Sequence, residues 1–219
     1  MPSVLALLTD PDAFFRTRVP DPSLKGPLAV IVLIAAANAA AALVQSRFMS
    51  QVFESGGMGG GFATALQGII FVFVIFGPFV IWLVYAGVFQ GISALFDGDG
   101  EFSTTLAFTG WGFVPSVLGS VASIAINYYR FNVRGVDVPD EMSMEAYRQF
   151  SQSLQTGPLV ALSATLALVF TLWSGFLWTF ALKHARDLTL RRAALTIAFP
   201  TAIGLLATLR TLLVALEVL

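Results

Sequence analysis

The sequence contains no cysteine and a single histidine. Without cysteine the chain can form no disulfide, thiolate metal site or cysteine nucleophile, although this absence does not fix the redox compartment. The lone histidine, His184, excludes a metal site built from several histidines. Its one acidic neighbour along the chain is Asp187, and no serine nucleophile motif is visible. We therefore expect His184 to contact lipid headgroups or an interface and predict no enzymatic activity.

Charged residues are also scarce. They make up 11% of the 219 residues, whereas soluble domains are about one-quarter charged. Apolar residues make up 57%, which is more apolar surface than one globular core can bury, so the excess is expected to face lipid. The formal net charge of −1 favours neither nucleic acid nor a strongly charged substrate. The first residues lack a basic cluster and a cleavage site, so we expect the first span to act as an uncleaved insertion signal.

Five apolar runs are each long enough to cross a bilayer as a helix, which takes about 20 residues. They are continuously apolar, whereas the strands of a membrane barrel alternate apolar and polar residues. No Asp or Glu lies inside them. We predict an all-α integral membrane bundle of about five helices, forming one membrane domain over residues 1–219. The predicted spans are residues 26–46, 66–96, 102–129, 158–182 and 193–216.

The orientation of such a protein follows from the basic residues in its loops, which are retained in the cytoplasm. With five spans, one side carries Arg16, Arg18, Lys25, Lys183, Arg186, Arg191 and Arg192. The other side carries fewer, namely Arg47, Arg130, Arg134 and Arg148. This bias predicts a multi-pass cell-membrane protein with its N-terminus in the cytoplasm and its C-terminus outside.

A short interfacial segment is expected before the first span, over residues 3–18. Asp10 can cap a helix that starts at Pro11, a favoured first position. Phe14 and Phe15 follow, flanked by arginines. Aromatic anchors beside arginine suit a helix in the headgroup layer. The alternative is a disordered leader.

A second interfacial segment is expected over residues 140–155. Tyr147, Phe150 and Leu154 fall on one face at helical spacing, and the remaining positions are mostly polar. We predict an amphipathic helix that lies on the outer membrane surface.

Arg210 is the one formal charge within a predicted span. Charges inside a membrane are functional candidates by default. Arg210 lies close to the C-terminal end of its span, however, so the alternative is that it reaches the interface or pairs with Glu217.

One loop carries acids at alternate positions: Asp97, Asp99 and Glu101. A calcium loop begins in this way, but Phe102 stands where its glycine is needed and Phe108 where its closing glutamate is needed. A turn followed by capping of the next helix by Ser103 is the simpler interpretation. We predict no metal and no cofactor.

Small residues recur every four positions in two spans, at Gly87 and Gly91 and at Gly112, Ser116 and Ser120. Such rows let helix backbones approach closely in lipid. We expect them to form seams within the chain, with self-association as the alternative.

Two segments together resemble the Yip family of membrane proteins, in its prokaryotic, archaeal branch. The first combines a glycine-rich turn, a helix start rich in Ser and Thr, a glycine–aromatic pair and a proline. Its matching residues are Asp97, Gly98, Gly100, Phe102, Gly110, Trp111 and Pro115. The second runs from Trp173 and Trp178 through residues 181–189 to Pro200.

The resemblance implies five spans with a cytoplasmic N-terminus, in agreement with the runs and the charge bias. Eukaryotic members bind Rab-type GTPases through a long N-terminal region and an Asp-Leu-Tyr-Gly-Pro motif, and this sequence shows neither, so we expect no Rab partner. We expect a role in membrane organisation, trafficking or scaffolding, with the lipid bilayer, other membrane proteins or a second copy as partners. The alternative is a small channel or transporter whose site lies at the broken helices around Gly77–Pro78 and residues 110–115.

Overall fold

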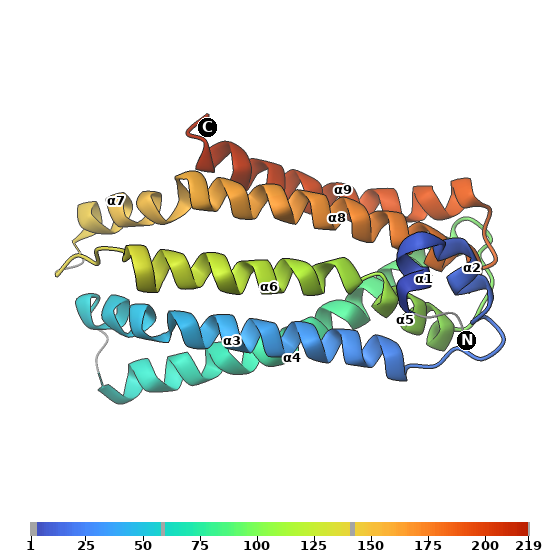
Figure 1. Cartoon of the computed structure of the whole chain (residues 1–219), viewed down its shortest axis with the longest axis horizontal. Coiled ribbons are helices and arrows are strands. Elements are labelled where there is room, and N and C mark those ends of the chain that lie inside the picture. Colours follow the sequence, from blue (N-terminus) through green and yellow to red (C-terminus); the bar gives the residue numbers. More distant parts are fainter. Residues whose placement is uncertain (1–3, 58–59, 141–142, 219) are drawn as a thin grey trace. The chain divides into compact units, whose positions relative to one another are not determined.

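The computed structural model describes residues 4–57, 60–140 and 143–218, and in these ranges the chain is helical without a strand (Figure 1). The elements are α1 Val4–Thr9, α2 Pro11–Arg16, α3 Lys25–Ser55, α4 Gly60–Ala94, α5 Phe102–Trp111, α6 Val114–Tyr128, the π-helix η1 Tyr129–Arg134, α7 Met144–Gln155, α8 Pro158–Ala185 and α9 Leu190–Ala215. Residue 3 and residues 141–142 of the predicted interfacial segments lie outside the described ranges.

Four of the described helices, α3, α4, α8 and α9, are long and apolar enough to cross a membrane. The pair formed by α5 and the continuous α6–η1 helix adds a fifth span if it is counted as one, with a bend of 41° at the break. This result confirms the all-α class and a span number of about five. The break falls at Gly112 and Phe113, inside the run that glycine and proline interrupt. The expected break of the second span around Gly77–Pro78 is wrong, because α4 continues through Pro78 as one helix.

The chain divides into two compact units, and the long helices contribute residues to both. The first unit contains Met1–Ile34, Pro78–Leu118 and Val169–Leu206. The second contains Ala35–Gly77, Gly119–Leu168 and Ala207–Leu219.

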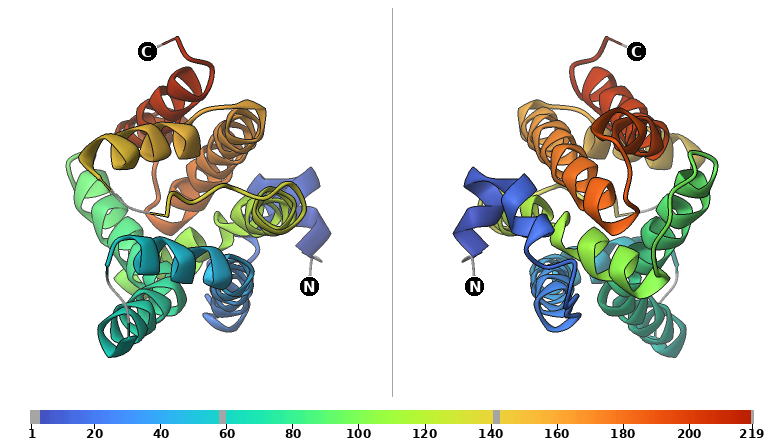
Figure 2. Two further views of the ribbon diagram at one scale, coloured as in Figure 1. Left: turned by 90° about the vertical axis from the view of Figure 1, so that its left-hand side faces the viewer. Right: turned by 90° about the vertical axis from the view of Figure 1, so that its right-hand side faces the viewer.

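Helices α1 and α2 pack into the core of the first unit, beside α5 and the end of α8 (Figure 2). Phe14 and Phe15 are fully buried, and their rings lie 5.2 Å from Trp111 and 5.1 Å from Phe108, respectively. The expectation that these two rings anchor in the headgroup layer is therefore wrong. Burial in a protein core removes them from both water and lipid, and it fixes α2 in place.

The helix starts follow local hydrogen bonding. The side chain of Asp10 accepts from the backbone N–H of Ala13 at 3.0 Å, which confirms the predicted cap of α2. The predicted capping of α5 by Ser103 is wrong, because α5 begins after Glu101. The hydroxyl of Ser103 donates instead to the Glu101 carboxylate at 3.0 Å.

The second unit is held by aromatic and amide contacts. Phe48 of α3 stacks near Phe131 and Phe150, with ring centroids 4.5 and 6.1 Å apart. The hydroxyl of Ser120 donates to the side-chain oxygen of Asn38 at 3.4 Å. α7 is amphipathic, and Phe150 is its buried residue.

Candidate functional site

Arg186 follows the end of α8 and is almost completely buried. Its Nε donates to the hydroxyl of Ser93 at 2.9 Å, and its two terminal nitrogens donate to the carbonyls of Gly98 and Gly100. The planar guanidinium offers five donors in a fixed fork, so one side chain can hold three acceptors from one connection. Arg186 therefore fastens the loop between α4 and α5 to the end of α8. We call this cluster the Arg186 junction.

The loop needs its glycines to reach Arg186. Gly100 has φ +146°, and a Cβ there would overlap the carbonyl oxygen of Ala185. A Cβ at Gly98 would stand 2.8 Å from the carbonyl oxygen of Ser93. Backbone approach at both positions is thus possible only without a side chain. The backbone N–H of Asp99 adds a return bond by donating to the Arg186 carbonyl at 3.0 Å.

Burial lowers the pKa of Arg186, and the nearby negative charge of Asp99 opposes that shift. An arginine nevertheless stays charged in proteins, so the junction holds a permanent positive charge. The acids of this loop, Asp97, Asp99 and Glu101, are all exposed, and Asp97 lies 3.5 Å from a terminal nitrogen of Arg192. The junction therefore presents three carboxylates on a loop of fixed shape.

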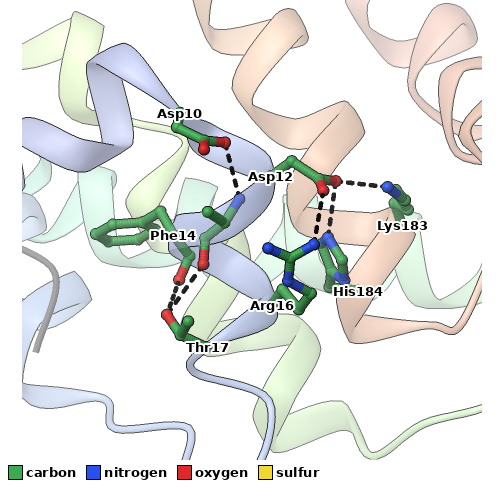
Figure 3. Close-up of polar contacts among 8 residues, drawn as sticks. Asp10, Asp12, Phe14, Arg16, Thr17, Lys183 and His184 are labelled. Carbon is green, nitrogen blue, oxygen red and sulfur yellow. Dashed lines mark hydrogen bonds and ion pairs between the residues drawn. The ribbon is translucent and has the colours of Figure 1, made fainter.

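A second contact fastens α2 to the end of α8 (Figure 3). One carboxylate oxygen of Asp12 accepts from Lys183 Nζ at 2.5 Å and meets His184 Nε2 at 2.9 Å. Arg16 lies 3.7 Å from the other oxygen. The hydrogen bonds from Lys183 and His184 hold the pKa of Asp12 below its usual value. We call this cluster the Asp12 clasp.

The position of His184 corrects the expectation that it lacks an acidic partner apart from Asp187. Its partner, Asp12, lies 172 positions away along the chain. Long-range pairs of this kind leave no signal in the spacing of a single sequence. The sequence indicates Asp12 only as an acidic residue in the first turn of a short helix, and gives no sign of its contact with α8.

The family-like residues of α5 serve packing around two tryptophans. The Trp82 indole donates to the Leu106 carbonyl at 2.8 Å, and the Trp178 indole donates to the Thr109 carbonyl at 2.8 Å. Thr109 lies in the last turn of α5, where its carbonyl also accepts from the backbone N–H of Gly112 at 3.1 Å, so Trp178 adds a second donor at the break.

Glycines make room for these rings. A Cβ at Gly110 would stand 2.9 Å from the Trp82 indole nitrogen, and a Cβ at Gly112 would overlap the Trp178 ring. Trp111 in turn covers Gly26, and Pro115 is buried at the start of α6. Phe102 is partly exposed. These residues therefore shape the first unit around the break.

The predicted rows of small residues do not act alike. Gly112 contacts Trp178, and Ser120 contacts Asn38, whereas the partly buried Ser116 side chain forms no hydrogen bond among the described residues. A Cβ at Gly87 or Gly91 would meet nothing within 4 Å. The row at Gly87 and Gly91 thus forms no seam within the described chain.

Arg210 is exposed on α9 in the second unit. Among the described residues no carboxylate pairs with it, so the alternative in which Arg210 pairs with Glu217 is not realised. The described ranges also contain no group of three or more His, Cys, Asp or Glu side chains that could hold a metal ion.

In the part of the chain that the structure describes, three buried hydroxyls of the first unit have no hydrogen-bond partner: those of Thr109, Ser174 and Thr201. A hydroxyl buried in this way is costly unless a water or ligand satisfies it. The three belong to α5, α8 and α9, respectively.

The Yip1 domain matches residues 5–210 of the chain. The chain belongs to the Yip1 domain family. An uncharacterized protein of the archaeon Methanocaldococcus jannaschii is 32% identical over 128 residues, which cover 58% of this chain and 89% of that relative. No solved structure matches the chain. Membership confirms the resemblance carried by the Asp97–Pro115 and Trp173–Pro200 segments, and the structure shows that these two segments of the Yip1 domain meet at Arg186.

Proposed function

We propose that this Yip1 domain protein is a non-enzymatic membrane scaffold, which offers a loop surface of fixed shape to other membrane proteins. The observation that carries the proposal is the Arg186 junction. Arg186 is the most buried cation of the first unit, and it holds the loop between α4 and α5. The carboxylates of that loop remain exposed. A loop ordered before a partner arrives loses less conformational entropy on binding.

The charge bias supports a cytoplasmic position for this surface. The Asp12 clasp and the Arg186 junction both end at the connection between α8 and α9, which is rich in basic residues. Such connections remain in the cytoplasm. The proposed partner is therefore a membrane protein with a basic cytoplasmic segment. Asp99 and Glu101 are the carboxylates for it, since they form no ion pair among the described residues, whereas Asp97 already pairs with Arg192.

A photo-crosslinker placed at Asp97 tests this function in native membranes, because the Asp97 side chain is 86% exposed. We expect a discrete crosslinked partner whose yield falls strongly when Arg186→Met releases the loop. Arg191→Met is the matched control, since it removes an exposed arginine from the same unit. Equal yields in the two variants would contradict the scaffold, because the loop shape would then be irrelevant.

A small channel or transporter is the second candidate, and two observations favour it. The span around Gly112 is bent by 41°, and broken helices can form sites near the middle of a membrane. The unpartnered hydroxyls of Thr109, Ser174 and Thr201 are groups that a passing polar solute can bind.

Flux into liposomes separates the two candidates. Protein reconstituted in liposomes should show no saturable uptake of ions or small solutes above empty liposomes if it is a scaffold. Saturable uptake that is reduced by Thr109→Val and also by Arg210→Leu would favour transport instead. Uptake reduced by Thr109→Val alone would place the path in the first unit.

A further inference from the structure

The second unit contains an apolar groove of about 530 Å³ between the end of α3 and α7. Phe48, Met49 and Val52 line it from α3, and Tyr147, Phe150 and Leu154 line it from α7. Its volume falls within the roughly 300–1,000 Å³ typical of small-molecule sites. The left-hand view of Figure 2 faces the ends of these two helices.

The groove belongs at the edge of the hydrocarbon layer. α3 has 31 residues and is about 46 Å long, whereas the hydrocarbon core is about 30 Å thick. The apolar run that fills this core ends near Ser46, so the α3 residues of the groove lie at the level of the lipid headgroups. An open apolar groove at this level is within reach of an acyl chain.

Arg130 contacts a residue that lines the groove, and Arg134 follows Arg130 in η1. A terminal nitrogen of Arg130 donates to the carbonyl of Leu154, and its guanidinium lies 5.3 Å from the Phe131 ring. Arg134 is one turn further along η1 and is exposed. Among the described residues neither arginine pairs with a carboxylate.

Like charges one turn apart repel each other, so a bound anion would stabilise this pair. The fork of a guanidinium suits a phosphate in particular. π-helical turns such as η1 are also frequent at functional sites.

We propose that the groove binds one acyl chain of an anionic phospholipid, whose phosphate is held by Arg130 and Arg134. The apolar lining supplies affinity for the chain, and the unpaired guanidinium groups supply selectivity for the negative headgroup. The site is independent of the Arg186 junction and does not rest on the scaffold function.

Native mass spectrometry of the full chain in detergent tests the site. Phosphatidylglycerol and phosphatidylcholine with the same acyl chains serve as probes. We expect one bound phosphatidylglycerol, retained about tenfold better than phosphatidylcholine, a ratio that corresponds to one charge-assisted hydrogen bond. Arg134→Gln and Arg130→Gln should each reduce that preference, and Ser151→Trp, which fills the groove, should lower the retention of both lipids.

Arg210→Gln is the matched control, since it removes an exposed arginine from α9 in the same unit. It should leave the preference unchanged. Arg134→Gln decides the outcome if Arg130→Gln unfolds, because the exposed Arg134 side chain forms no hydrogen bond or ion pair within the described chain. Equal retention of the two lipids by the wild type, an equal effect of Arg210→Gln, or unchanged binding in Ser151→Trp would each overturn the proposal.

Discussion

Replacing Arg186 with Met removes every donor of the Arg186 junction while keeping most of the apolar stem. Of its three acceptors, Ser93 is fully buried and Gly98 is partly buried, whereas Gly100 is exposed and can bond to water instead. Two bonds to a charged donor at about 1.5 kcal/mol each give a loss of about 3 kcal/mol. If the loop opens as a local unit that recloses faster than its amides exchange, this loss corresponds to about 100-fold faster exchange of those amides.

Hydrogen exchange of the amides of Gly98 and Asp99, measured by mass spectrometry in detergent, reports this opening. Their N–H groups donate to the carbonyls of Ser93 and Arg186, respectively, so neither bond is removed directly by the substitution. Arg186→Lys should give an intermediate rate, because an ammonium cannot reproduce the fork. Exchange that stays at the wild-type rate in Arg186→Met, or that rises equally in Arg191→Met, would refute the reasoning.

Three further predictions concern the first unit. The partners of Asp12 lower its pKa, so the Asp12 clasp stabilises the fold at pH values above the unfolded pKa of about 3.9 and loses this contribution as the pH falls further. In the wild type, the hydrogen exchange of the α2 amides, corrected for the intrinsic rate, should therefore rise below this pH. In Asp12→Asn the corrected exchange should be independent of pH. Gly112→Ala places a Cβ in the Trp178 ring and should lower the free energy of unfolding by about 1–3 kcal/mol, as measured by thermal unfolding. Gly87→Ala places its Cβ in open space and should leave that free energy unchanged or raise it. Trp178→Phe leaves the Thr109 carbonyl without its indole donor and should cost about 1 kcal/mol in the same assay, and an unchanged melting temperature would contradict this role.

The helical class and the number of spans could be predicted from the sequence because a bilayer imposes them directly. A run of about 20 apolar residues has few alternatives to a spanning helix. Glycine and proline alone do not locate a break, since the run breaks at Gly112 and Phe113 whereas α4 continues through Gly77 and Pro78. The cap at Asp10 was predictable for a similar reason, since it depends on contacts three residues apart. Burial of Phe14 and Phe15 was not, because the same aromatic pair suits a headgroup anchor or a protein core.

The candidate site was only partly visible. Gly98, Gly100 and Gly110 were singled out by their resemblance to a family, but the physical reason for glycine there is a close approach to Ser93, Ala185 and Trp82, respectively. Arg186 itself was counted only as a loop cation, since its acceptors are backbone carbonyls 86 and 88 positions away. Backbone acceptors have no residue type, so no pattern of side chains can indicate them.

The two units use their charged side chains in opposite ways. All four ion pairs of the described residues lie in the first unit, where Asp12 and Asp97 connect segments distant in sequence. In the second unit, Arg130 and Arg134 have no such partner within the described chain. A membrane protein so poor in charge places few cations near lipid without a counter-ion, because their desolvation is costly. Arg130 and Arg134, which pair with no carboxylate of the described chain, are therefore the arginines best placed to bind an anion from outside the chain. In the first unit, by contrast, the buried Arg186 already donates to carbonyls of the chain's own backbone.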